Sequence, residues 1–113
     1  MHHGVTPFDE WLHKAQVGTR DLELVPALNA VARHATVAFG AQLWFAAIFG
    51  RRWSCIAGQA PQQPVAEAPS RVALTGGIGV VSACWGSLSR GECARLVGFL
   101  ERLIESKQRP TGS

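Results

Sequence analysis

The clearest pattern of hydrophobic and polar positions lies near the end of the chain, from Ser89 to about Ser106. Apolar side chains recur there at the three- and four-residue spacing of one helical face. Ser89 and Glu92 have the spacing of a capping box, in which each side chain accepts a hydrogen bond from the other residue's backbone N–H. The pattern predicts a capped amphipathic helix. Its apolar face consists of Cys93, Leu96, Val97, Leu100, Leu103 and Ile104.

A second helix is predicted near the N-terminus. Thr6 has the position of a helix cap, Pro7 suits the first helical position, and two acidic residues follow in the first turn. The next apolar residues share one face of this helix: Phe8, Trp11, Leu12 and Ala15. Gly18 is expected to end the helix at about Val17.

The stretch from about Asp21 or Pro26 to Gly50 predicts a longer helix. It is rich in Ala, Leu and Phe, and residues 34–50 contain no Asp, Glu, Lys or Arg. A helix drawn through residues 43–49 is apolar on every side. Such a helix lies either in the centre of a core or in a membrane.

Residues 57–70 and 71–85 have different patterns. The first segment holds several prolines among Gln, Ala and Glu, which predicts an extended surface loop. In the second, Gly76-Gly77 separates two apolar runs, as in a β-hairpin with a glycine turn. A helix with small residues for close packing fits the same letters, because periodicity cannot separate the two on so short a run. Residues 108–113 are expected to form a flexible tail.

Together these patterns predict a mainly α fold. We expect a single domain over residues 1–113 that forms a small bundle of three or four helices. If residues 71–85 are not helical, they add a short β-hairpin to this bundle. The chain has 113 residues, of which 47% are hydrophobic, enough for a real but modest core. Only 17% are charged, below the roughly 25% usual for a soluble domain. The low charge suits a tightly folded or oligomeric protein, or one that meets lipid.

Two uncharged runs decide between these options. Residues 34–50 and residues 72–89 each lack charged side chains, and arginines bracket both. A membrane-spanning helix needs about 20 apolar residues, with roughly 17 as the lower limit. Both runs are therefore marginal, and the polar side chains of His34 and Gln42 weaken the first. We expect a cytoplasmic protein, with a small membrane protein of two short spans as the alternative.

The residue types that usually carry chemistry are scattered along the chain. The chain has three cysteines, and no two of them form a CxxC motif: Cys55, Cys84 and Cys93. We therefore expect them to be small buried residues of a protein from a reducing compartment. His13 and His34 fall on different predicted elements, and neither has a Cys or Ser partner at local spacing. The sequence indicates no catalytic residue, no cofactor and no metal site, and an enzyme is the less favoured interpretation.

The function that these patterns favour is a small helical interaction or regulatory subunit. So much apolar surface in so short a chain is hard to bury fully in a monomer. We therefore expect the protein to self-associate as a homo-oligomer or to dock on a partner protein through apolar helix faces. The candidate interaction face is that of the last predicted helix, with Leu96, Leu100 and Leu103 at its centre.

The same C-terminal helix resembles part of a known family. The pattern that carries the resemblance is Leu88-Ser-x-x-Glu-x-x-x-Leu-x-x-Phe-Leu-x-Arg-Leu. It is similar to the final dimerisation helix of winged-helix regulators such as the MarR family, which implies a helical DNA-binding transcriptional regulator as a further alternative. No helix-turn-helix pattern precedes it, and a net charge of +3 with scattered arginines is not a nucleic-acid footprint. Nucleic acid is therefore not the expected partner.

Overall fold

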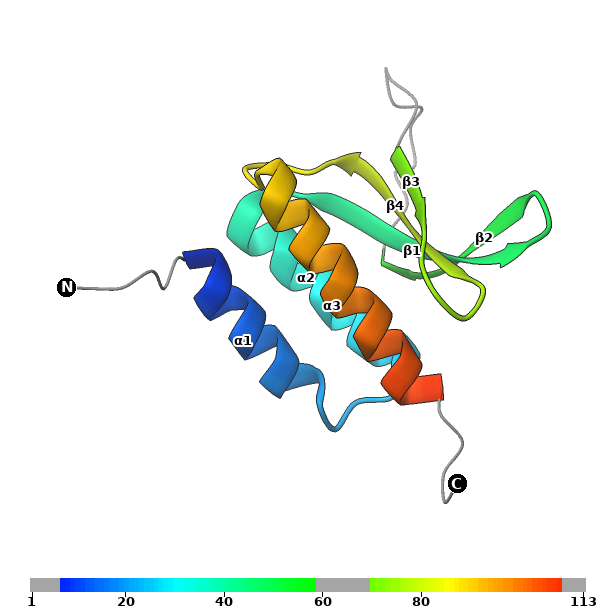
Figure 1. Ribbon diagram of the computed structural model, residues 1–113, viewed down its shortest axis with the longest axis horizontal. Helices are drawn as coiled ribbons and strands as arrows, with labels where there is room; N and C mark the ends of the chain where they lie inside the picture. Colours follow the sequence, from blue (N-terminus) through cyan, green and yellow to red (C-terminus); the bar gives the residue numbers. More distant parts are fainter. Residues whose placement is uncertain (1–6, 59–69, 109–113) are drawn as a thin grey trace.

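The computed structural model of the protein describes residues 7–58 and 70–108 and shows three helices on one side of a four-stranded antiparallel sheet (Figure 1). The elements follow in the order α1 (Pro7–Thr19), α2 (Leu24–Phe39), β1 (Gln42–Phe49), β2 (Arg52–Gly58), β3 (Ser70–Ala73), β4 (Ile78–Cys84) and α3 (Arg90–Gln108). The fold is α+β, and the prediction of a mainly α helical bundle is wrong.

The long helix predicted to reach Gly50 is replaced in its second half by a strand. α2 ends at Phe39, where Gly40 has a left-handed φ of 71° and its N–H donates to the carbonyl oxygen of Thr36. Glycine commonly ends helices in this way because it has no Cβ to clash in the left-handed region. β1 then carries apolar side chains on both faces. A strand of that kind lacks two-residue alternation, so residues 43–49 resemble a buried helix in sequence.

The sheet is built from two hairpins that meet through their inner strands, in the order β2-β1-β4-β3. The first hairpin joins β1 to β2 through Gly50-Arg51. The second joins β3 to β4 through a turn in which Gly76 and Gly77 have φ angles of 67° and 75°. The glycine-turn hairpin considered for residues 71–85 is therefore present, as half of a larger sheet.

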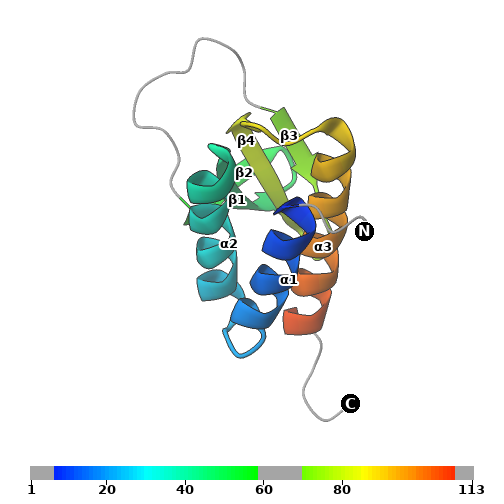
Figure 2. The same ribbon diagram turned by 90° about the vertical axis from the view of Figure 1, so that its left-hand side faces the viewer.

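The elements form three layers. α2 and α3 lie against one face of the sheet, and α1 packs on the side of these two helices that faces away from the sheet (Figures 1 and 2). The core runs through all three layers. Its largest fully buried side chains are Phe8, Phe45, Leu28, Leu96, Leu100, Ile104, Val31 and Val80.

α3 begins as the capping box predicts. The backbone N–H of Glu92 donates to Oγ of Ser89 at 3.1 Å, and the backbone N–H of Ser89 donates to Oε1 of Glu92 at 2.9 Å. This reciprocal pair satisfies two donors that the first turn of a helix leaves open. Leu96, Leu100 and Ile104 are each 0% exposed, so the apolar face of α3 closes the protein's own core.

α1 also forms where it was predicted, but Gly18 does not end it. Gly18 lies inside the helix, which continues to Thr19. The hydroxyl of Thr19 donates to the carbonyl oxygen of Ala15 at 2.7 Å and is thereby satisfied although it is buried. Thr6, the predicted cap, lies outside the described residues.

The predicted loop at 57–70 and tail at 108–113 lie mostly outside the described residues. Of their ends, residues 57–58 belong to β2, Ser70 begins β3 and Gln108 ends α3. These ends are therefore parts of regular elements.

The two predicted membrane spans are not continuous helices. Residues 34–50 hold the last turns of α2 and all of β1, and residues 72–89 hold the end of β3 and all of β4. Within the described parts of the chain, no helix combines the length and the apolar character that crossing a bilayer requires.

Candidate functional site

An aromatic cluster holds the start of α1 against its neighbours. The ring centroids of Phe8 and Trp11 are 6.0 Å apart, and Phe39 at the end of α2 lies 5.9 Å from Phe8 and 5.2 Å from Trp11. Arg95 of α3 lies over the Phe8 ring, 5.1 Å from its centroid, and forms an ion pair with Asp9. Aromatic pairs of this kind contribute about 0.5–1.5 kcal/mol beyond the burial of their area. The position of α1 is thus fixed from both α2 and α3.

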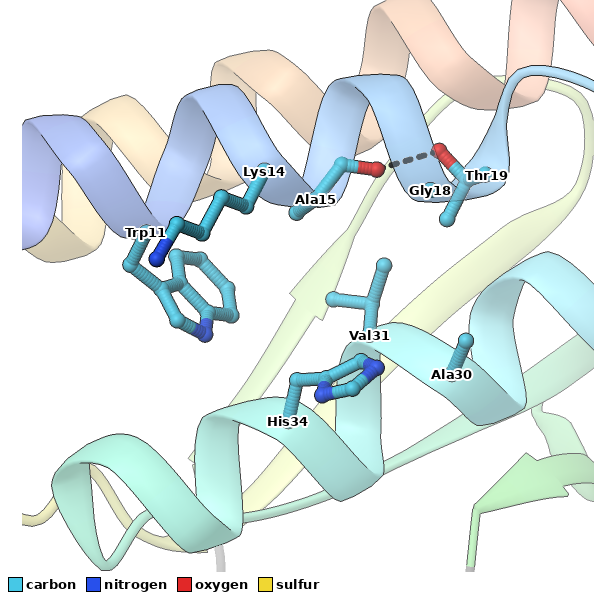
Figure 3. A pocket seen from close by; sticks show the side chains of 8 residues that line it. All are labelled: Trp11, Lys14, Ala15, Gly18, Thr19, Ala30, Val31 and His34. Carbon is cyan, nitrogen blue, oxygen red and sulfur yellow. Dashed lines mark hydrogen bonds between the residues drawn. The ribbon is translucent and has the colours of Figure 1, made fainter.

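A groove opens between α1 and α2 farther along the two helices (Figure 3). Its volume is about 180 Å³. We call it the α1–α2 groove. It is lined by Trp11, Lys14, Ala15, Gly18, Thr19, Ala30, Val31 and His34.

The groove exists because the residues at its walls are small. Gly18 of α1 has no side chain, and Ala30 of α2 has only a methyl group. A Cβ atom placed on Gly18 would meet no other atom within 4 Å. Ala15 and Val31, at 6% and 0% exposed, form part of the apolar core beneath. The groove therefore has an apolar floor and room for a group from outside.

Two exposed side chains at the groove carry polar end groups, Lys14 from α1 and His34 from α2, and the indole N–H of Trp11 is a further donor (Figure 3). Lys14 supplies an ammonium group, which only donates hydrogen bonds, and His34 supplies one donor and one acceptor when it is neutral. The Thr19 hydroxyl already donates to a backbone carbonyl. The groove can therefore hold an apolar group whose neighbour carries a negative charge or a hydrogen-bond acceptor.

The stripe of α2 that lines the groove also carries an exposed apolar residue, Val37. Ala30, His34 and Val37 lie on one stripe of the helix, because positions i, i+4 and i+7 share a face. Val37 is 82% exposed. A single exposed valine is ordinary on a protein surface. Val37 is not among the residues that line the groove, but it continues the stripe of α2 to which Ala30 and His34 belong.

The interaction face predicted on α3 is largely occupied by the core. Leu96, Leu100, Leu103 and Ile104 are buried, and Cys93 and Val97 are half-buried. Burial raises the pKa of the Cys93 thiol, and the nearby charge of Glu92 raises it further. The fold therefore brings the six residues together on one side of α3 but leaves little of that side at the surface.

The other candidate residues do not gather into a site. In residues 7–58 and 70–108, no group of three or more His, Cys, Asp or Glu side chains is placed to hold a metal ion. Cys55 and Cys84 are exposed free thiols, and His13 is exposed on α1. Of the histidines considered from sequence, His34 lines the groove.

The sequence patterns did not predict the groove. Gly18 was assigned to the end of a helix, and no sequence pattern singled out Lys14. The available signal was the set of small residues at Ala15, Gly18 and Ala30, since small side chains leave space where helices approach. That signal needs the pairing of α1 with α2, which no local pattern supplies.

Comparison with known proteins leaves the geometry of the protein as the guide to its function. No family model matches the chain, and neither a curated protein nor a solved structure matches it.

Proposed function

We propose that the protein is a non-enzymatic interaction module that docks on a partner polypeptide through the α1–α2 groove. An apolar side chain of the partner enters the groove, and an acidic residue beside it pairs with Lys14. The observation that carries the proposal is the groove itself, with its apolar floor and its exposed ammonium group.

The size of the groove favours a side chain over a free ligand. Pockets for small molecules usually measure about 300–1,000 Å³, whereas this groove measures about 180 Å³. A groove between two helices suits an amphipathic segment of a partner, which places one anchor residue in the groove and runs along the helices on either side. Val37 lies where such a segment would continue along α2.

The position of the groove also favours docking. α1 and α2 are held by aromatic contacts at one end, so the walls are preformed and little ordering entropy is lost on binding. The groove offers a partner an apolar floor at the surface, whereas most of the apolar face of α3 is buried.

Gly18→Leu tests the proposal with little risk to the fold. The new side chain would occupy the groove from α1, and its Cβ meets no atom within 4 Å. Gly98→Leu is the matched control, because Gly98 is likewise inside a helix with open space around it. Replacing glycine inside a helix favours the helix by up to about 1 kcal/mol, so both variants should keep the thermal stability of the parent.

The assay uses a peptide selected from a displayed random library and measures its affinity by fluorescence anisotropy. We expect selected peptides to combine an apolar anchor with an acidic residue. Gly18→Leu should weaken binding about 30-fold, equivalent to a hot-spot contact of about 2 kcal/mol, while Gly98→Leu stays within about twofold of the parent. Lys14→Met should weaken binding about two- to fivefold and reduce its dependence on salt.

Equal affinity in Gly18→Leu and the parent would contradict the proposal, as would a library that yields no peptide sensitive to this variant. Sedimentation of the protein alone shows whether a second copy acts as the partner. In that case the parent should associate and Gly18→Leu should be monomeric at the same concentration.

A further inference from the structure

The net charge of the described residues lies on the sheet and its turns. The helices and the segment between α1 and α2 carry seven basic and seven acidic residues, which balance. The strands and their turns carry three arginines, Arg51, Arg52 and Arg71, and no carboxylate. A surface with cations and no anions attracts negatively charged partners, and the attraction is strongest where the cations lie close together.

Two of these arginines lie at the tip of the β1–β2 hairpin, together with the most exposed aromatic side chain among the described residues. Phe49 is 67% exposed, and Gly50-Arg51 forms the turn that follows it. Arg51 and Arg52 are both exposed. The hairpin extends away from the helices (Figure 1), so its tip is convex and accessible. We call Phe49, Gly50, Arg51 and Arg52 the hairpin tip.

Trp53, the residue that follows the hairpin tip, braces the strands that carry the tip. A Cβ atom on Gly79 of β4 would collide with the Trp53 ring, so the ring lies directly on this glycine across the sheet. The guanidinium of Arg71 lies over the same ring, 5.7 Å from its centroid. Trp53 also pairs with Ile48 in the strand register. The hairpin tip is therefore carried by a rigid base rather than by a loose loop.

We propose that the hairpin tip binds the surface of an anionic lipid bilayer. Phe49 inserts among the headgroups, and Arg51 and Arg52 contact lipid phosphates. Aromatic side chains favour this interfacial region, and arginine can hold phosphate while its aliphatic stem lies against apolar groups. Basic residues near an anionic membrane surface each contribute to binding, and an apolar insertion adds to this. This contact is peripheral and needs no membrane-spanning helix.

The arrangement fits a bilayer better than a nucleic acid. Single-stranded nucleic acids bind in basic grooves where several aromatic rings stack on bases. Here the Trp53 ring is already engaged by Gly79 and Arg71, and the exposed ring of Phe49 stands on a convex tip. This contact is distinct from the proposed docking function, because the α1–α2 groove is lined by residues of α1 and α2. The β1–β2 turn points away from α1 (Figure 1), so a membrane at the hairpin tip leaves the groove accessible.

Co-sedimentation with vesicles tests the inference. One set of vesicles contains phosphatidylcholine alone, and the other contains a mixture of phosphatidylcholine and phosphatidylserine. We expect the protein to sediment with the mixed vesicles, to remain in solution with phosphatidylcholine, and to dissociate as salt is raised.

Variants of exposed residues connect binding to the hairpin tip. Phe49→Ala should weaken binding about tenfold, and the double variant Arg51→Gln/Arg52→Gln about 30-fold. The matched control is Arg33→Gln/Arg102→Gln, which removes two exposed arginines from helices. It changes the net charge by the same amount as the double tip variant but leaves the tip intact, so its affinity for the vesicles should stay within about twofold of that of the parent. All these side chains are exposed, so thermal unfolding should show that each variant is folded.

Failure of the parent protein to bind the mixed vesicles overturns the inference, and so does equal binding by the two tip variants and the helix control. Single-stranded DNA and polyglutamate are added as competitors. Displacement of the vesicles by either at low concentration assigns the hairpin tip to nucleic acid or to an acidic protein, which also overturns it. None of these results depends on the groove, because the variants of the groove and of the tip share no residue.

Discussion

Replacing Leu100 by alanine separates a core role of the α3 face from a docking role. Leu100 is 0% exposed and lies at the centre of the apolar face of α3. A buried leucine shortened to alanine loses the transfer free energy of its methyl groups and leaves a cavity that the neighbours fill only in part. In comparable cores this costs about 3–5 kcal/mol. The whole domain is expected to have only about 5–15 kcal/mol of stability.

The effect should therefore be large in any equilibrium unfolding experiment. Urea denaturation followed by circular dichroism should show a free energy of unfolding that is lower by about 3–5 kcal/mol. The urea midpoint should fall accordingly, with the slope of the transition unchanged. The melting temperature should fall by more than about 10 °C. Val37→Ala is the control, because Val37 is 82% exposed and its truncation should change stability by less than about 0.5 kcal/mol.

A Leu100→Ala variant as stable as the parent would mean that this side chain is not part of the core. Loss of self-association or partner binding at unchanged stability would mean that the α3 face is a docking surface.

Three further predictions concern other contacts. Gly79→Ala should lower stability by about 1–3 kcal/mol and change the tryptophan emission, because the new methyl group displaces the Trp53 ring; unchanged emission and stability would contradict the described contact. Ser89→Ala should cost about 1 kcal/mol in denaturant unfolding, since it removes the acceptor for the backbone N–H of Glu92, and a neutral result would count against the capping box. Cys93 should be alkylated more slowly at neutral pH than the exposed Cys55 and Cys84, because burial and Glu92 raise the pKa of the Cys93 thiol and reduce its thiolate fraction. Peptide mass spectrometry after a short iodoacetamide treatment measures the order, and faster labelling of Cys93 would contradict the burial.

The helices that carry their own start signals were predictable from sequence. α3 has a capping box and an apolar stripe, both local features, and the structure contains both. α1 has proline and acidic residues in its first turn and an aromatic face, and it too lies where predicted. The reason is physical: caps and stripes depend on neighbours within a turn or two of the same helix.

The sheet was not predictable in the same way. Leu43 to Phe49 consists of apolar residues without alternation, because the inner side faces the helices and the outer side is largely apolar as well. That pattern suits a buried strand and a buried helix equally. Gly40 was the local signal that the helix ends, but an isolated glycine inside a helical pattern is often tolerated. The pairing of β1 with β4, which builds the sheet, is a long-range contact with no local signature.

The candidate sites were even harder to predict from the sequence than the sheet. The apolar face of α3 was visible in the sequence, but whether the face meets a partner or the protein's own core depends on the other elements. The groove depends on the approach of α1 to α2 and on the absence of a side chain at Gly18. The hairpin tip was not predicted, because Phe49 was placed inside a predicted helix. Arg51 and Arg52 were interpreted only as the flank of an uncharged run.

Docking of a partner on α1 and α2 can be followed residue by residue in a titration monitored by nuclear magnetic resonance. The isotope-labelled protein is titrated with a selected peptide, and the backbone amide shifts are mapped onto the fold. If the partner docks in the α1–α2 groove, the largest changes should fall on Lys14, Gly18, Ala30 and His34, with little change along α3 from Leu96 to Ile104. Changes centred on α3, with none at Gly18 or Ala30, would show that the partner does not bind in the groove.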